Sequence, residues 1–198
     1  MYKTLNMTRK ISKKEIRKQR RLQIIKENKA LYNTNINLPE VSIYTDGSCT
    51  RNPGGIGGYA AIIINNSNSS KRKVIVEGYR QTTSNRMELM AAIFGLEALK
   101  KRCKVTVYTD SEYLANGINL NWAKNWSKKN WVLKQKIRPN HDLWKRLLTL
   151  CEYHVVWFNA IPRNSMPEQE KCDELAGIFT KTHSYDILPV DEEYENKI

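Results

Sequence analysis

The sequence predicts an α/β domain built on a mixed five-stranded sheet, with three antiparallel strands, then parallel strands, and helices on both faces. Three observations predict this fold. Apolar and β-branched runs alternate with Gly- and Asn-rich turns from residue 41 onward, as in consecutive hairpin strands. Helix and strand patterns then alternate as far as residue 181. The chain has 198 residues, of which 40% are hydrophobic, and this is enough to bury the core of one domain.

The individual elements follow from local patterns. Helices are expected where apolar residues recur at helical spacing behind a capping residue, and strands where apolar runs are short and bounded by turns. A Trp- and Lys-rich segment, 121–139, interrupts the second half. The expected strands are 41–45, 59–64, 74–79, 105–109 and 154–158; the expected helices are one capped by Ser84 or Asn85 and running through Leu99, a short one after Ser111, and 141–152 and 167–181.

Both ends of the chain differ in charge from the middle. Residues 1–40 carry eleven Lys or Arg against three acids, and Ser12 with Glu15 forms a capping box, so a basic and partly helical N-terminal extension is expected. It is either a solvated tail or an electrostatic arm that binds nucleic acid or a protein or ribonucleoprotein partner. The predicted domain covers 41–183, and 184–198 is predicted to be an acidic C-terminal tail.

The net charge of +13 favours a polyanionic partner, of which nucleic acid is the commonest. The four cysteines have neither disulfide-like nor zinc-like spacing, so free thiols and a reducing compartment are expected. No apolar run reaches the roughly 18 residues of a membrane span. We therefore expect an intracellular protein without membrane contact, cytoplasmic in the first instance, with a mitochondrial presequence as the alternative. Monomer is the default expectation.

Four acidic side chains stand where metal-dependent hydrolysis would need them. Asp46 and Asp110 each end a Tyr-Thr-Asp sequence on an apolar strand, where a bare carboxylate is costly unless it is paired or binds metal. Glu88 and Asp173 lie early in two helices. Phosphodiester hydrolysis can use two divalent cations, and Mg²⁺ prefers clustered carboxylates. Singly, such acids are more often turn, cap or solvated residues.

Four segments resemble, in order and separation, the signature blocks of bacterial-type ribonuclease H type 1: YTDGSCTRNPGGIGGYAAI, TTSNRMELMAAIFGLEAL, VTVYTDSEYLANGI and EKCDELA. The resemblance runs from about residue 41 to 181. It implies the ribonuclease H-like fold and endonucleolytic hydrolysis of the RNA strand of RNA–DNA hybrids, leaving 3′-hydroxyl and 5′-phosphate ends. It also implies two Mg²⁺ ions, for which Mn²⁺ can substitute, held by Asp46, Glu88, Asp110 and Asp173.

The same resemblance implies substrate-binding positions. Small polar side chains suit the wide, shallow minor groove that displays 2′-hydroxyls, and lysines suit phosphates. The tryptophans of NWAKNWSKKNWVLKQK, which resembles the family's basic protrusion, either stack on sugars or pack against the body, and packing is the favoured interpretation for most of them. The implied positions are Asn52, Thr83, Ser84, Asn85, Glu112 (where the family often has Gln), Trp122, Lys124, Trp126, Lys128, Lys129 and Lys134.

One position departs from the family pattern. Counting back from Asp173 places Arg163 where the family has a His that assists proton transfer or product release. Arginine cannot act as a base near neutral pH, but it can offset phosphate charge, so Arg163 is kept as a catalytic candidate with an altered role. His141 and His154 are expected to be structural. His183 is the sole candidate to replace the missing His, provided that the tail folds back.

Two alternatives compete with a hybrid-cleaving enzyme. One is a DNA-cutting nuclease of the same fold, which would share the clustered carboxylates but not the RMELMA and CDELA segments together. The other is a binding subunit that keeps the fold with weak or no catalysis, suggested by the missing His and the basic arm. The four acids argue against the second, because uncompensated carboxylates repel one another.

Overall fold

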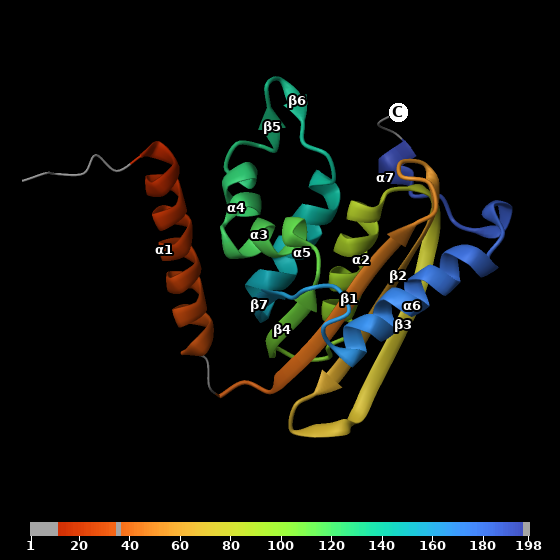
Figure 1. Ribbon diagram of the computed structural model, residues 1–198, viewed down its shortest axis with the longest axis horizontal. Helices are drawn as coiled ribbons and strands as arrows, with labels where there is room; N and C mark the ends of the chain where they lie inside the picture. Colours follow the sequence, from red (N-terminus) through yellow and green to blue (C-terminus); the bar gives the residue numbers. More distant parts are fainter. Residues whose placement is uncertain (1–11, 35–36, 196–198) are drawn as a thin grey trace, which may run out of the picture.

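The computed structural model describes residues 12–34 and 37–195, and its five main strands form one sheet in the order β3-β2-β1-β4-β7 (Figure 1). β2 is antiparallel to β1 and β3, whereas β4 is parallel to β1 and β7 is parallel to β4. This confirms the predicted mixed sheet. The strands are β1 (Glu40–Cys49), β2 (Gly55–Asn65), β3 (Asn68–Thr82), β4 (Lys104–Thr109) and β7 (Val155–Ala160).

Helices cover both faces of the sheet. Ile43 of β1 belongs to the larger core, which α2, α3 and α5 complete, and the next residue, Tyr44, belongs to a smaller core beneath α6. Successive strand residues point to opposite faces, so the two cores lie on opposite sides. The helices are α1 (Lys13–Asn33), α2 (Ser84–Glu97), α3 (Glu112–Asn119), α4 (Trp122–Ser127), α5 (His141–Tyr153), α6 (Pro167–Thr182), the 3-10 turn η1 (Tyr185–Ile187) and α7 (Glu192–Glu195); β5 (Val132–Leu133) and β6 (Lys136–Ile137) form a small hairpin.

The start of α2 differs from the prediction by one residue. Thr83, in an extended conformation, is the N-cap, and its hydroxyl accepts a hydrogen bond from the Arg86 backbone N–H at 3.3 Å. Ser84 and Asn85 are therefore the first helical residues and neither of them is the cap. Three successive polar residues, Thr83 to Asn85, look alike in the sequence, and only the backbone conformation decides which of them caps the helix.

The basic N-terminal extension contains a helix, as expected. Its N-cap is Ser12, whose hydroxyl accepts from the Glu15 backbone N–H, and none of its residues is buried. Near its C-terminal end, Asn28 donates to the carbonyl of Asn119, and the Tyr32 hydroxyl lies 2.8 Å from that of Thr106. Near its C-terminal end, α1 is thus attached to α3 and β4. The rest of the extension, residues 1–11, lies outside the described residues.

The outer edge of β7 is closed by a side chain. The Asn119 carboxamide donates to the carbonyl of Phe158 at 2.6 Å and accepts from its N–H at 3.3 Å. Both backbone groups of Phe158 point away from β4 at the end of the sheet. One amide side chain therefore satisfies the two groups that a neighbouring strand would otherwise bond.

A buried ion triad joins the end of the chain to the core. The Arg86 guanidinium is only 1% exposed and pairs with Asp142 at 2.7 Å and with Asp191 at 2.5 Å. Thr82 also donates its hydroxyl to Asp191. Around these contacts, backbone bonds from Arg80 to Pro189 and from Asp191 to Arg80 tie the segment to β3. The segment predicted as an acidic tail therefore supplies, through Asp191, a buried partner for Arg86 that the sequence did not reveal.

Two bulk features complete the description. The four cysteines are free thiols, as expected from their spacing. Within the described residues, 12–34 and 37–195, no helix combines the length and the apolar composition that crossing a bilayer requires.

The ion triad predicts a large effect of one C-terminal substitution. Asp191→Ala leaves the Arg86 guanidinium buried with one partner fewer, so the free energy of unfolding should fall by about 3–5 kcal/mol. Urea denaturation followed by circular dichroism measures this. Asp186→Ala removes an exposed acid of the same segment and should change the value by less than about 0.5 kcal/mol. Equal effects of the two substitutions would contradict the structural role of Asp191.

Candidate active site

The register of two parallel strands brings two of the predicted acids together. Tyr44 of β1 pairs with Tyr108 of β4, and their rings stack with centroids 4.7 Å apart. Asp46 comes two residues after Tyr44, and Asp110 comes two residues after Tyr108. Both acids therefore lie at the same end of the strand pair. Asp46 does not end its strand, because β1 continues beside β2 as far as Cys49.

A glycine lets the helix α2 bring the third acid close. A Cβ on Gly47 would lie 2.3 Å from the backbone nitrogen of Glu88, so only glycine permits this approach of β1 to α2. The Gly47 N–H donates to Asp46 Oδ1 at 2.8 Å and to Glu88 Oε1 at 3.2 Å. Carboxylate oxygens of Asp46, Glu88 and Asp110 all lie within 4.8 Å of one another.

The electrostatics of this group fit a cation. Burial, then the charge of Asp110 and contacts with Asp173, raise the pKa of Asp46 to about 7. Burial, then the charges of Asp46 and Asp110, raise the pKa of Glu88 well above its usual range. Asp46 Oδ2 and Glu88 Oε2 are buried and have no hydrogen-bond partner among the described residues. Oxygen donors that are buried, mutually repelling and unpartnered are suited to a hard divalent cation such as Mg²⁺.

The fourth predicted acid lies next to this group rather than within it. Asp173, on α6, is close enough for its charge to help raise the pKa of Asp46, so it is a close neighbour of that carboxylate. It is 32% exposed, and its Oδ1 accepts a hydrogen bond from the guanidinium of Arg163, itself 66% exposed. Of the four acids predicted to hold the metal ions, three therefore lie together in the structure. The fourth, Asp173, forms an ion pair with Arg163.

The chain has three histidines; His141 is the first residue of α5, and neither His154 nor His183 fills the place of the missing His. His183 stacks on Phe179 with ring centroids 3.9 Å apart, at the C-terminal end of α6. It lies ten residues beyond Asp173, which is roughly 15 Å along a helix at about 1.5 Å per residue. Although the tail does fold back, His183 stays away from the acids. His154 is buried and accepts from the Cys103 N–H, in the structural role that we expected.

Several of the predicted substrate-binding residues lie beside the start of α2. Asn52 Oδ1 accepts from the backbone N–H of Ser84 at 3.4 Å, which ties the loop after β1 to the helix. Asn52, Thr83 and Asn85 line one pocket of about 500 Å³, with Asn85 exposed. Glu112 is the exposed first residue of α3, two positions beyond Asp110.

The basic protrusion separates its tryptophans from its lysines. Trp126 is half-buried, packs edge-on against Trp144 with centroids 5.6 Å apart and carries Arg138 above its ring. Trp122 is also half-buried, with its ring 6.2 Å from that of Trp126, which agrees with the favoured packing interpretation. The lysines of this segment are exposed; they are Lys124, Lys128, Lys129, Lys134 and Lys136.

Sequence reasoning missed two residues that build the site. Gly47 makes room for Glu88, and Arg86 fixes the first turn of α2 through its two buried acids. A glycine directly after an acid within an apolar strand was the available signal for the first. The second had no local signal, because its partners lie 56 and 105 residues away in the sequence.

Known proteins are similar to this chain in sequence. The RNase H family profile matches residues 39–179. Ribonuclease H of Desulforamulus reducens is 46% identical over 161 residues, covering 80% of this chain and 97% of the relative, and ribonuclease H of Salmonella arizonae is 49% identical over 142 residues, covering 70% and 88%.

Solved structures agree in fold. The crystal structure of LC9-RNase H1, a type 1 RNase H with the type 2 active-site motif, matches with a TM-score of 0.66 at 24% identity, covering 82% of each chain. LC11-RNase H1 in complex with RNA/DNA hybrid matches with a TM-score of 0.51 at 22% identity, covering 71% of this chain and 96% of that one. The sequence relatives confirm the family that the signature segments predicted, and the solved structures agree with it in fold. This chain therefore belongs to the ribonuclease H family and is an enzyme of that family.

Proposed function

We propose that this protein hydrolyses the RNA strand of RNA–DNA hybrids with two bound Mg²⁺ ions, or Mn²⁺ in their place, and leaves 3′-hydroxyl and 5′-phosphate ends. The observation that carries the proposal is the group of three carboxylates within 4.8 Å of one another. Two of them keep a buried oxygen without a hydrogen-bond partner in the described part of the chain. Such a group is unstable without a cation and is therefore built to bind one.

The acids have distinct tasks in this proposal. Asp46, Glu88 and Asp110 would hold the ions, with Asp173 completing the set. Bound ions of this kind make a water nucleophilic and offset the charge of the attacked phosphate and of the leaving oxygen. The Gly47 N–H orients Asp46 and Glu88 by bonding one oxygen of each, which leaves their second oxygens for a ligand.

Arg163 is proposed to act in place of the family His. Its guanidinium pairs with Asp173 beside the acidic group. The pairing with Asp173, together with the other acids nearby, raises the pKa of Arg163 further, so it stays a cation and cannot relay a proton. We expect it to contact the phosphate of the substrate or product, and to compete with a cation for Asp173.

Substrate selection is assigned to the residues around the start of α2. The pocket lined by Asn52, Thr83 and Asn85 presents small polar groups near the acids, and Ser84 bonds to the same loop. Groups of this kind can bond 2′-hydroxyls in a minor groove. The exposed lysines of the protrusion would bind the backbone. A reducing compartment such as the cytoplasm is proposed for this activity, because all four cysteines are free.

A labelled RNA–DNA hybrid incubated with Mg²⁺ tests the proposal. Cleavage of the RNA strand alone, with 5′-phosphate on the products, is expected. Cleavage of the DNA strand would favour the DNA nuclease, and tight binding without cleavage would favour the binding subunit.

Asp46→Asn should lower the cleavage rate by on the order of 10³-fold or more, because one ligand and its charge are lost from the site. Binding of the hybrid in EDTA should remain within about twofold, since Asp46 is buried and the lysines proposed to bind the phosphates are unchanged. Steady-state cleavage and fluorescence anisotropy measure the two quantities. Asp186→Asn, in the exposed 3-10 turn, is the control, and a fully active Asp46→Asn protein would refute the site.

The raised pKa values predict a pH-dependent stability without metal. Asp46 and Glu88 bind protons more tightly in the folded than in the unfolded state, so they favour folding at low pH. Their contribution should be lost as the pH rises from about 4 through about 7 in EDTA, and Mg²⁺ should restore it. The measurement is the difference in unfolding free energy between the unaltered protein and Asp46→Asn/Glu88→Gln. A difference independent of pH would contradict the prediction.

Arg163→His should raise the turnover number several-fold and lower the Mg²⁺ concentration for half-maximal rate, because His competes less for Asp173 and can exchange a proton near neutral pH. Multiple-turnover kinetics over a Mg²⁺ titration measure both. Arg146→His breaks the exposed pair with Glu97 and serves as the control. If turnover falls in Arg163→His but not in the control, Arg163 itself is the better catalyst at this position.

A further inference from the structure

One face of α1 changes character along its length. The half-buried residues of its C-terminal half follow one stripe at helical spacing, whereas the positions that continue this stripe toward the N-terminus are basic. The half-buried residues are Ile24, Ile25, Asn28 and Tyr32, and the basic positions are Arg21, Arg17 and Lys14. The helix face that contacts the body at one end is therefore cationic at the other.

A contact shows where this cationic face points. The Arg21 guanidinium lies 5.8 Å from the ring centroid of Trp122, the first residue of α4. Figure 1 shows α1 running beside the part of the domain that carries α3 and α4, with its N-terminal end toward the β5–β6 hairpin. The basic residues that precede Arg21 on its stripe thus face α4 and the protrusion.

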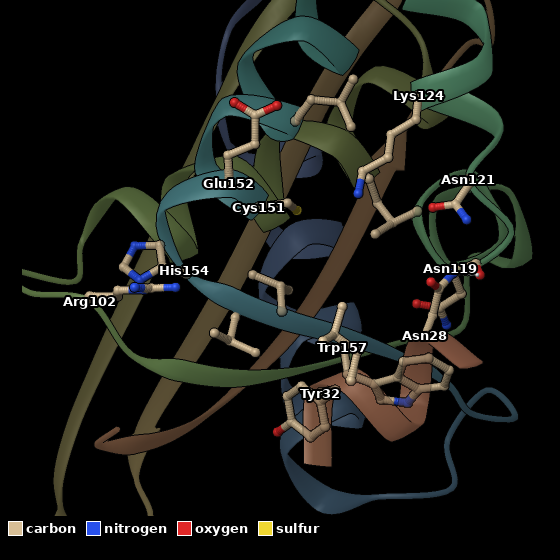
Figure 2. Close-up of a pocket in the computed structure, with 15 residues that line it drawn as sticks. Asn28, Tyr32, Arg102, Asn119, Asn121, Lys124, Cys151, Glu152, His154 and Trp157 are labelled. Atoms are coloured by element: carbon tan, nitrogen blue, oxygen red, sulfur yellow. Dashed lines mark hydrogen bonds between the residues drawn. The ribbon is translucent and has the colours of Figure 1, made fainter. Parts of the chain in front are cut away.

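The facing wall is basic as well. Residues 113–141 contain six Lys or Arg and no acid. Lys124 of α4 lines a pocket of about 330 Å³ whose opposite side is Asn28 and Tyr32 of α1. Figure 2 shows Lys124 and Asn121 at one end of this pocket, and Tyr32 and Trp157 at the other. Solvent-accessible space therefore separates Lys124 from the C-terminal half of α1.

Two walls of like charge repel unless something neutralises them. The helix α1 has eight basic residues and two acids, and no ion pair found within 12–34 and 37–195 involves any of them. The six basic residues of 113–141 are equally without acidic partners in that part of the chain. An extended polyanion between the walls would contact both and offset the repulsion.

The apolar residues of α1 argue against a protein or membrane partner. Ile16, Leu22 and Leu31 are more than half exposed, but the spacings of six residues to Ile16 and nine to Leu31 put Leu22 on a different face of the helix from both. An amphipathic helix that docks in an apolar groove or on a lipid surface needs them on one face. Charge is the only feature that α1 presents as a continuous stripe.

A chain of contacts leads from this stripe to the acids. Arg21 lies over Trp122, whose ring neighbours Trp126, and both tryptophans line one pocket with Asn85. Asn85 lies one helical turn before Glu88 on α2. A nucleic-acid strand that extends from the acids across the protrusion would therefore next contact α1.

From these observations we propose that α1 and the protrusion form a two-walled phosphate-binding channel for the backbone of the nucleic-acid duplex, with Lys14, Arg17 and Arg21 as one wall and Lys124, Lys128 and Lys129 as the other. The inference rests on the proposed function for the identity of the duplex, an RNA–DNA hybrid. It assigns to the N-terminal extension a defined, face-specific part in substrate binding.

The test compares two triple substitutions in the full chain that remove equal charge. Lys14→Gln/Arg17→Gln/Arg21→Gln alters the stripe, and Lys13→Gln/Arg20→Gln/Lys26→Gln alters other faces of the same helix. Affinity for an RNA–DNA hybrid is measured by fluorescence anisotropy in EDTA across a salt series. The stripe variant should bind on the order of tenfold more weakly, and its log-log salt slope should shrink by about 2.7, at about 0.9 for each of three phosphates. The control variant should change the affinity less than threefold.

A third variant tests the docking of α1. Asn28→Ala/Tyr32→Phe keeps every charge but removes the hydrogen bonds of Asn28 to Asn119 and of Tyr32 to Thr106, and it should also weaken binding. Equal losses in the two charge variants, no loss in either, or unchanged affinity in the undocked variant would each overturn the channel. Because binding is measured in EDTA, absence of cleavage by the unaltered protein would count against the proposed function alone.

Discussion

Repulsion among the carboxylates of Asp46, Glu88 and Asp110 is the unfavourable interaction that the packing of the rest of the domain must offset. Three acids within 4.8 Å disfavour the folded state at neutral pH, so they stay together only if rigid elements hold them. Parallel pairing of β1 with β4 fixes two of them, and the close approach of α2 at Gly47 fixes the third. Buried apolar residues of α2 against the sheet supply the favourable free energy that offsets this repulsion.

The order of the strands and most of the site could be predicted from the sequence, because their signals are local. Apolar alternation marks β1 to β3, and the repeated Tyr-Thr-Asp marks the two strand positions that bring Asp46 and Asp110 together. The signature segments place Glu88 and Asp173 on helices. The meeting of Asp46 and Asp110 follows once their strands are taken as neighbours, and the structure places both acids, together with Glu88, within 4.8 Å of one another.

What could not be predicted depends on contacts between distant residues. Asp191 looked like one acid of a solvated tail, yet it is buried against Arg86, since the backbone of the segment pairs with Arg80. The capping role of Thr83 depends on a backbone angle that its neighbours' chemistry does not fix. The pairing of Arg163 with Asp173 required the geometry of the loop before α6. Each of these is a long-range or conformational fact without a periodic signature.

The carboxamide of Asn119 at the outer edge of β7 has a consequence for how copies of this protein meet. An exposed strand edge is a template on which another chain can add a strand, and such growth is a common start of aggregation. At Phe158 the edge offers neither a free donor nor a free acceptor, because one side chain has taken both. If several copies of this highly basic protein bound along one polyanion, their β7 edges would come close to one another. The Asn119 carboxamide would then prevent a strand of one copy from pairing with Phe158 of the next.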